Sequence, residues 1–338
     1  MFHVAISQLT TSRWELPEEI ARLADNGFDC LSLWRAKLSD LGHAAAASLL
    51  TEAGMSVSSL QWAGGFTGGD GRTFAESIAD AAEAIEAAAT LGAPVLLVHS
   101  GCRGGHTRAH ARRLLVQALE TLAPLAGRAG VTLAVKPVHA AAAPGCSFLT
   151  RAIDALELVA EVADPAVRMA LDLWQFGDDE ELPRLLPQLA AATAVVQVAD
   201  RVGPPTAELE RLPVGHGGLP LESLILSLID HGYSGAFEFD PVGEAVASLG
   251  YDRVLAETRQ IVDAWTAVME QRLLWNRAAS AVWQTAGLRT AAASDGGLDQ
   301  PLWQTVWPRL TGDSTGGSQL RSAGSRRSHA SSQTVSPG

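Results

Sequence analysis

Val131-Thr-Leu-Ala-Val-Lys136-Pro137-Val-His139 is a short apolar run rich in β-branched residues. It follows a stretch with helical spacing, residues 108–129, and a single glycine, Gly130. A glycine directly after a helix is a frequent stop signal. A continuous apolar run of this length indicates a strand that is covered on both faces. The run is interrupted by the polar Lys136, and this unit of helix, glycine, buried strand and polar strand end decides the fold.

The same unit recurs along the chain. Apolar runs of strand length occupy residues 3–7, 28–34, 57–62, 94–99, 131–138, 167–172, 194–198 and 236–240. Helical spacing lies between several of them, at residues 16–25, 74–91, 108–129 and 153–162, and glycines precede strands at Gly27, Gly54, Gly92, Gly130 and Gly232. The α/β pattern predicts a (β/α)₈ barrel, which takes about 250 residues.

An open, doubly wound sheet is the alternative architecture. That fold usually carries a glycine-rich phosphate loop after its first strand. The first strand here is followed by Gln8-Leu-Thr-Thr-Ser-Arg-Trp14, which contains no glycine. We therefore favour the barrel, and we expect it to span residues 1–272.

The character of the chain changes after residue 272. Residues 273–308 form a tryptophan-containing extension with Trp275, Trp283, Trp303 and Trp307. Residues 309–338 are rich in Ser, Gly and Thr and are predicted to be a disordered tail, because such a composition offers little to bury.

The composition of the chain limits the classes of binding partner and the cellular compartment that we expect. The net charge of −12 disfavours nucleic acid and anionic membrane surfaces as partners. The sequence has neither a signal-peptide pattern nor an apolar run of the roughly 20 residues that a membrane span needs. Its three dispersed cysteines suit a reducing compartment. We expect a cytoplasmic protein with a small-molecule ligand, and a homo-oligomer stays open.

Polar residues mark the ends of the predicted strands, where (β/α)₈ barrels place their chemistry. Polar groups at the ends of apolar strands need partners or a function, because burying them unpaired is costly. Those at or near the ends of the later strands are His99, Lys136, His139, Asp172, Gln175, Gln197 and Glu238, and Arg211 lies in a following loop.

Four segments resemble motifs of the xylose-isomerase-like sugar isomerase/epimerase family. They are Lys136-Pro137, Ala170-Leu171-Asp172, the loop Arg211-Leu-Pro-Val-Gly215-His216-Gly217, and His231-Gly-Tyr-Ser-Gly235-Ala-Phe-Glu238. The resemblance covers roughly residues 1–272. It implies a TIM barrel that moves a proton next to a carbonyl, using a divalent metal held by Glu, Asp, His and Glu on strands five to eight.

This chain departs from that ligand pattern. The four positions read Lys136, Asp172, Gln197 and Glu238, and Gln175 replaces a histidine that contacts substrate in the family. An ammonium cannot ligate a metal unless it loses its proton, and its charge repels the ion. Asp172 and Glu238 remain as remnants of the metal site, and we expect Lys136 to relieve their repulsion in place of a metal cofactor. Lysine is otherwise rare here, since Lys37 is the only other one among 25 basic residues.

The resemblance also implies roles for individual residues. Glu238 would be the base, Lys136 would stabilise an enediolate beside Asp172, and Arg211 would clamp a substrate oxyanion. Gln175, Gln197, His99 and His139 would contact hydroxyl groups. Trp14, Trp34, Trp62 and Trp174 fall at or beyond strand ends and are predicted to form an aromatic wall for a sugar-like ligand.

Three functions stay open at this point. The first is a sugar or sugar-phosphate isomerase/epimerase that has lost its metal. The second is a catalytically silent homologue that binds a polyol, which the changes at Lys136, Gln175 and Gln197 favour. The third is Schiff-base chemistry on Lys136, which ranks last because adjacent carboxylates raise the pKa of a lysine.

Overall fold

A computed structural model describes residues 2–142, 145–208 and 210–285. The chain divides into a compact unit, Met1–Glu270, and a second unit that begins at Gln271. Every residue of the candidate site lies in the first unit. No helix in the described ranges has the length and apolar character to cross a bilayer.

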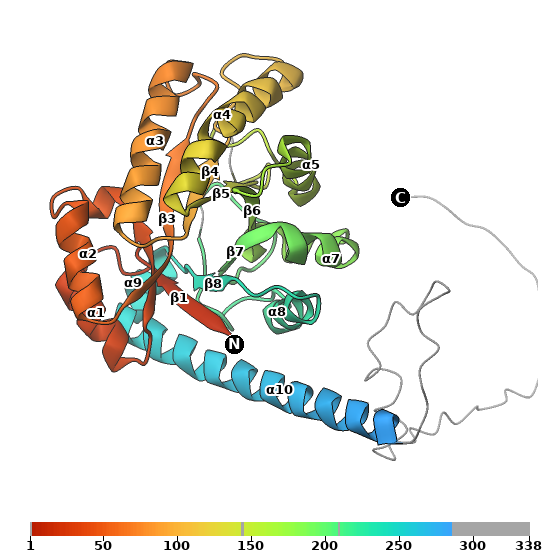
Figure 1. Ribbon diagram of the computed structural model, residues 1–338. Helices are drawn as coiled ribbons and strands as arrows, with labels where there is room; N and C mark the ends of the chain where they lie inside the picture. The colour runs from red at the N-terminus through yellow and green to blue at the C-terminus, as the bar shows by residue number, and fades with distance from the viewer. Residues whose placement is uncertain (1, 143–144, 209, 286–338) are drawn as a thin grey trace, which may run out of the picture. The chain divides into compact units, whose positions relative to one another are not determined.

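Eight parallel strands form a closed barrel in the order β1 to β8, which confirms the predicted fold (Figure 1). β1 closes the barrel by pairing with β8, with Ala5 opposite Glu238. The strands are β1 (His3–Ser7), β2 (Cys30–Trp34), β3 (Ser56–Gly64), β4 (Val95–His99), β5 (Thr132–Lys136), β6 (Val167–Asp172), β7 (Thr193–Val198) and β8 (Ala236–Phe239).

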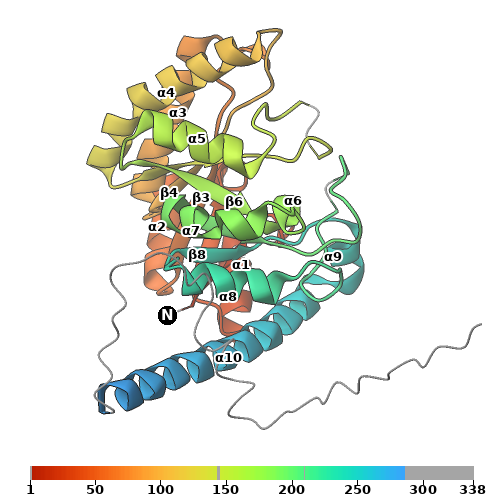
Figure 2. The ribbon, with the colours of Figure 1, turned by 90° about the vertical axis from the view of Figure 1, so that its right-hand side faces the viewer.

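Helices cover the outside of the barrel, and short segments follow the carboxyl ends of some strands (Figure 2). The outer helices are α1 (Leu16–Asp25), α2 (His43–Glu52), α3 (Phe74–Thr90), α4 (Arg108–Ala129), α5 (Ala152–Val162), α7 (Leu182–Ala192) and α8 (Leu221–Asp230). The short segments are η1 (Arg35–Leu38), α6 (Leu173–Phe176) and α9 (Glu244–Leu249). Leucine and alanine side chains of the helices pack on the outer faces of the strands and form the main core.

The last helix is longer than the sequence predicted. α10 runs from Tyr251 to Thr285 and so passes Arg272, where we expected the barrel to end. Residues 272–285 contain neither glycine nor proline, so nothing in the local sequence stops the helix. The remaining extension and the predicted tail, residues 286–338, lie outside the described residues.

The barrel interior is layered, and this layering positions the site. Side chains of a strand alternate between the two faces. A small apolar layer consists of Val95, Leu97, Ala134, Ala170 and Val195. Two residues further along the same strands come His99, Lys136, Asp172 and Gln197, so the alternation places these polar side chains in the next layer toward the carboxyl ends.

Candidate active site

Strand pairing brings the polar layer together. His99 is opposite Lys136, Asp172 is opposite Gln197, and Gln197 is opposite Glu238. Asp172, Gln197 and Glu238 have no exposed surface, and Lys136 is 8% exposed. The four positions that resemble a metal site therefore lie in one buried ring at the mouth of the barrel.

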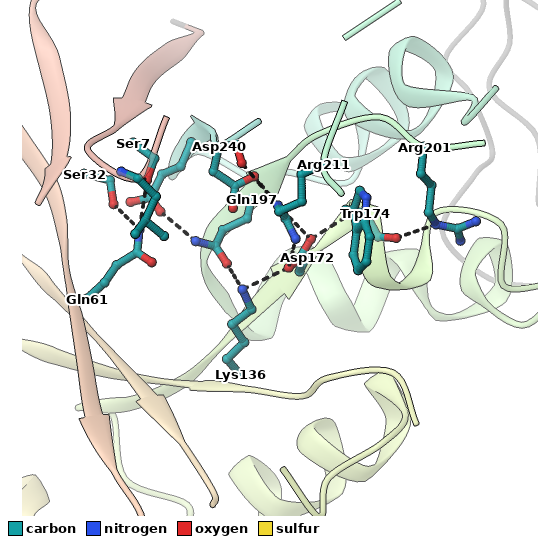
Figure 3. Close-up of polar contacts among 12 residues, drawn as sticks. Ser7, Ser32, Gln61, Lys136, Asp172, Trp174, Gln197, Arg201, Arg211 and Asp240 are labelled. Carbon is teal, nitrogen blue, oxygen red and sulfur yellow. Dashed lines mark hydrogen bonds and ion pairs between the residues drawn. The ribbon is translucent and has the colours of Figure 1, made fainter. Parts of the chain in front are cut away.

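Lys136 joins β5 to β6 and β7 (Figure 3). Its Nζ lies 2.9 Å from Oδ2 of Asp172 and also donates a hydrogen bond to Oε1 of Gln197. The predicted ion pair between Lys136 and Asp172 is confirmed. The second neighbour differs from the prediction, because the amide of Gln197, and not the carboxylate of Glu238, accepts from Lys136. An ammonium has three protons, so one proton of Lys136 has no acceptor among the described residues.

Asp172 is held by two cations. Arg211 donates to both of its oxygens, Nη1 to Oδ2 and Nη2 to Oδ1, each at 3.0 Å. Oδ1 also accepts from the backbone N–H of Trp174 at 3.0 Å. Although burial opposes it, the positive charges of Arg211 and Lys136 hold the pKa of Asp172 well below its usual value. Both oxygens are therefore occupied, and Asp172 orients its neighbours.

Arg211 is engaged by other groups of the protein. Besides Asp172, its Nη2 donates to Oδ1 of Asp240 at 2.6 Å (Figure 3). Its Nε donates to the backbone oxygen of Asp240, and its guanidinium lies 5.1 Å from the ring centroid of Trp174. With two carboxylates and a backbone oxygen as partners, Arg211 fixes the floor of the site and is poorly placed to clamp a substrate oxyanion.

The loop that carries Arg211 is held by a buried carboxylate. Oδ2 of Asp200 accepts from the N–H groups of Gly215 and Gly217, and its Oδ1 accepts from Leu219. A Cβ added at Gly217 would lie 2.3 Å from Oδ1 of Asp200, so the close packing requires glycine. The Arg-Leu-Pro-Val-Gly-His-Gly sequence is thus explained by loop structure, and it presents Arg211 to the barrel.

Glu238 belongs to the buried ring and is enclosed by hydroxyl groups. Its Oε1 accepts from Ser58 at 2.7 Å and from Ser59, while Nε2 of Gln197 is 3.4 Å from its Oε2. Burial raises the pKa of Glu238, and the hydrogen bonds from Ser59 and Ser58 oppose that rise. Glu238 has no exposed surface and does not line the cavity described next. This position does not fit the predicted role of a base that contacts substrate.

A cavity of about 690 Å³ opens above this floor. Of the predicted site residues it is lined by Trp62, His99, Lys136, Gln175 and Arg211. Asp172, Gln197 and Glu238 support the floor without lining it. The arrangement brings a cation, an amide and an aromatic ring to one cavity, which is a suitable lining for a small polar ligand.

Asp240 also lines the cavity, and sequence reasoning missed it as a functional residue. Its Oδ1 is bonded to Arg211, whereas Oδ2 has no partner in the described part of the chain. Burial raises the pKa of Asp240 to about 7, against the opposing charge of Arg211. The spacing of Asp240 from Glu238 could have identified it, because residues two positions apart on a strand point to the same face.

Of the four tryptophans predicted to form an aromatic wall, Trp62 alone lines the cavity. Trp62 lines the cavity, is 45% exposed and packs edge-on against His99, with ring centroids 5.5 Å apart. Trp14 packs against Tyr251, and Trp174 is buried under Arg211 with its Nε1 donating to the backbone of Glu210. Trp34 does not line the cavity either. Bulky rings at strand ends fill the space between strand and helix, so position alone does not bring them to a cavity.

The remaining predicted residues differ in their access to ligand. Gln175 lines the cavity, and its Oε1 accepts from the backbone N–H of His139 at 3.0 Å, which leaves its amide N–H groups for a ligand. The ring of His139 packs near Phe176 and does not line the cavity. Burial and the charge of Lys136 lower the pKa of His99 to about 3, so His99 is a neutral wall residue.

A second polar group lies at the rim of the cavity. Arg35 and Arg72 both pair with Asp80, at 3.1 and 3.0 Å, and all three line the cavity. Arg35 donates to the backbone oxygen of Trp62, and Arg72 donates to that of Gly64. These contacts fix the end of β3 and so the position of Trp62.

The donor set does not fit a divalent metal. Such an ion needs several carboxylate or imidazole ligands. Here one ligand position is an ammonium, Asp172 has both oxygens bonded to cations, and Glu238 accepts from two serines. No cluster of three or more His, Cys, Asp or Glu suited to a metal occurs within residues 2–142, 145–208 and 210–285. We therefore derive no step through a metal.

Known proteins resemble this chain over most of the barrel. The family described as xylose isomerase-like TIM barrel matches residues 20–261. A putative hydroxypyruvate isomerase of Streptomyces coelicolor is 29% identical over 264 residues, which covers 71% of this chain and 90% of the relative.

Two solved structures share the fold. A protein from Sinorhizobium meliloti has a TM-score of 0.71 at 23% identity and covers 76% of this chain and 96% of its own. An L-ribulose 3-epimerase has a TM-score of 0.66 at 17% identity, and the match covers 81% of this chain and 98% of the epimerase. At these identities the two structures support the barrel architecture alone.

Proposed function

This chain belongs to the xylose isomerase-like TIM barrel family, and from that premise we propose that it is an isomerase or epimerase of a small hydroxy-carbonyl compound. In this proposal Lys136 supplies the positive charge that a metal ion would supply in the family's ligand pattern. One observation carries it: the ammonium of Lys136 lies at the cavity floor, fixed by Asp172 and Gln197, with one proton left for a ligand.

The reaction moves a proton between neighbouring carbons. A base removes a proton from the carbon that bears a hydroxyl group, and the electron pair forms a carbon–carbon double bond while the carbonyl oxygen becomes an oxyanion. A fixed positive charge and amide N–H groups stabilise such an oxyanion without reorganising. Lys136 and Gln175 supply these groups. The hydroxyl proton moves to the oxyanion, and return of the first proton to the former carbonyl carbon completes the isomerisation.

Asp240 replaces Glu238 as the proposed proton carrier. It is the carboxylate that lines the cavity beside this floor and keeps one oxygen, Oδ2, without a protein partner in the described ranges. Asp172 has no unoccupied oxygen, and Glu238 is enclosed by serines below the cavity. General acid–base catalysis by a placed carboxylate contributes roughly 10² to 10⁴ in rate.

Hydroxypyruvate is the first substrate to test, because the curated relative is a putative hydroxypyruvate isomerase. The assay follows conversion of hydroxypyruvate to its 2-hydroxy-3-oxo isomer by proton NMR, with a chelator present throughout. We expect turnover by the wild type and a loss of about 10² or more in kcat for Asp240→Asn. Asp178→Asn is the matched control, since Asp178 is 55% exposed and pairs with Arg201 away from the cavity.

A catalytically silent polyol-binding protein is the second candidate. The enclosed position of Glu238 favours it, because the family's second acidic residue no longer reaches the cavity. This candidate predicts that ligands bind, that Trp62 fluorescence responds to them, and that neither hydroxypyruvate nor keto sugars are turned over with or without added metal. Turnover that depends on Asp240 excludes it.

A further inference from the structure

A basic segment of this acidic protein lies next to the mouth of the barrel. Between residues 87 and 119 the sequence has four arginines and three histidines but no Asp or Glu, although the whole chain carries a net charge of −12. The segment includes β4, the loop after it and the first half of α4. The carboxyl end of β4 carries His99, so this basic segment begins at the wall of the candidate active site.

A second cavity, of about 710 Å³, lies in this basic region. Its lining includes Arg103, Arg108 and Thr150. Cys102 and Gly145 line both this cavity and the one above Lys136, so the two cavities are immediate neighbours. A ligand with its reactive end at Lys136 and enough length would extend toward the arginines.

The charges around the second cavity are not balanced. Arg103 makes no ion pair with any residue in the described ranges. Arg108 lies 2.7 Å from Oδ2 of Asp154, and Arg151 lies 3.5 Å from the other oxygen of the same carboxylate. Two arginines therefore share one carboxylate, and Arg103 adds a further positive charge. The half-buried hydroxyl of Thr150 has no partner in the described part of the chain and offers a hydrogen bond to a ligand.

Guanidinium groups and a hydroxyl favour an oxyanion with several acceptors. Arginine binds phosphate through paired, charge-assisted hydrogen bonds. The 22-residue helix α4 also begins at Arg108, and the positive end of its dipole adds to the field of the side chains. The overall negative charge repels anions elsewhere, so this region is a local exception.

We propose that the cavity of Arg103, Arg108 and Thr150 is a distal subsite for the phosphate group of the substrate. The inference deepens the proposed function and rests on it: the substrate is a phosphorylated hydroxy-carbonyl compound whose carbonyl end lies at Lys136. Arg103 is the residue that determines this preference, because its charge is not compensated by the protein. Free inorganic phosphate has the same chemistry and is the alternative source of a bound anion.

The test compares the binding of a phosphorylated and an unphosphorylated ketose to the full chain. D-ribulose 5-phosphate and D-ribulose are titrated by calorimetry into the wild type, Arg103→Glu and Arg128→Glu. Arg128 lies near the other end of α4, lines neither the cavity above Lys136 nor the cavity of Arg103, and serves as the control for a charge change. We expect the wild type and Arg128→Glu to bind the phosphate ester at least about tenfold more tightly than D-ribulose, as charge-assisted contacts to phosphate imply.

We expect Arg103→Glu to lose this difference while its affinity for D-ribulose stays unchanged. Equal affinity of the wild type for both sugars, a preference that survives in Arg103→Glu, or no binding of the ester overturns the proposal. Phosphorus NMR with inorganic phosphate tests whether the cavity binds free phosphate instead. If phosphate binding depends on Arg103 but the phosphate ester binds no more tightly than D-ribulose, the cavity is a site for a free anion and the proposal is overturned. Failure of the proposed function appears separately, as absence of turnover of both hydroxypyruvate and D-ribulose 5-phosphate.

Discussion

Lys136→Glu restores the residue that the family's pattern has at this position, and its effect is worked from the contacts of Lys136. The substitution removes the ion pair with Oδ2 of Asp172 at 2.9 Å and places a carboxylate beside a carboxylate that has no exposed surface. Removing one partner of a buried pair costs about 3–5 kcal/mol when the other charge is left unpaired. Asp172 keeps two hydrogen bonds from Arg211, so the lower end of that range applies.

The new carboxylate adds a second cost. Next to Asp172 it must be protonated at neutral pH, and raising a glutamate pKa from about 4.3 to 7 costs 1.36 kcal/mol per unit, roughly 3–4 kcal/mol. We expect a total loss of about 6–7 kcal/mol in the free energy of unfolding. At about 2–4 °C per kcal/mol for a domain of this size, the midpoint of thermal unfolding should fall by roughly 12–28 °C.

A divalent metal should reverse much of this loss. The new carboxylate and Asp172 present two neighbouring acidic groups to one ion, and a metal at 100 times its dissociation constant stabilises by about 2.7 kcal/mol. The assay is thermal unfolding followed by circular dichroism, in EDTA and in MnCl₂. Lys136→Met lacks the added carboxylate, so we expect it to be destabilised by about 3 kcal/mol and not to respond to the metal.

Lys37→Glu is the matched control, because it makes the same charge change in the only other lysine. Lys37 pairs with the buried Glu19 at 2.9 Å, away from Asp172. We expect it to be destabilised in EDTA without recovery in MnCl₂. The reasoning is refuted if Lys136→Glu unfolds within about 2 °C of the wild type in EDTA, or if MnCl₂ stabilises the wild type as much as the variant.

Three further predictions concern the neighbours of Lys136 and the Arg211 loop. The pKa of His99 is lowered to about 3. Below about pH 6.5 the unfolded chain therefore binds a proton that the folded chain does not, so stability is lost as the pH falls toward 3. When urea unfolding is measured at pH 7 and at pH 5, the free energy of unfolding should fall by about 1–2 kcal/mol less in His99→Asn than in the wild type. Gly217→Ala should lose about 1–3 kcal/mol in urea unfolding, because its Cβ would lie 2.3 Å from Oδ1 of Asp200, whereas Gly218→Ala, with nothing within 4 Å, should be neutral. Asp172→Asn should lose about 3–5 kcal/mol in thermal unfolding, because Lys136 and Arg211 would face each other without their shared carboxylate, and a change below 1 kcal/mol would contradict this assignment.

The fold was largely predictable from the sequence because barrel strands are buried on both faces. Mostly apolar runs such as residues 167–172, interrupted by Arg168 and ending at Asp172, have little ambiguity, and β6 (Val167–Asp172) has the predicted bounds. The polar residue at each strand end was predictable for the same reason, since a lysine or aspartate in such a run stands out. The ion pair between Lys136 and Asp172 follows from neighbouring strands and opposite charge.

Side-chain direction beyond the strand ends was not predictable. The sequence does not say that Arg211 turns inward to Asp172 and Asp240, because its position depends on a loop held by Asp200. It does not separate Trp62, which lines the cavity, from Trp174, which is buried. The role of Asp240 was missed because the resemblance drew attention to Glu238 at the neighbouring position on the same face.

The most direct test of the central claim is proton exchange at the hydroxymethyl carbon of hydroxypyruvate, measured by NMR in deuterated water with EDTA present. If Lys136 acts in place of a metal, the wild-type protein should catalyse this exchange in the presence of EDTA. Lys136→Met, which keeps the barrel but removes the ammonium, should lose about 10² or more of that rate. Exchange that appears only when a divalent metal is added back, or that is equally fast in Lys136→Met, would contradict the account.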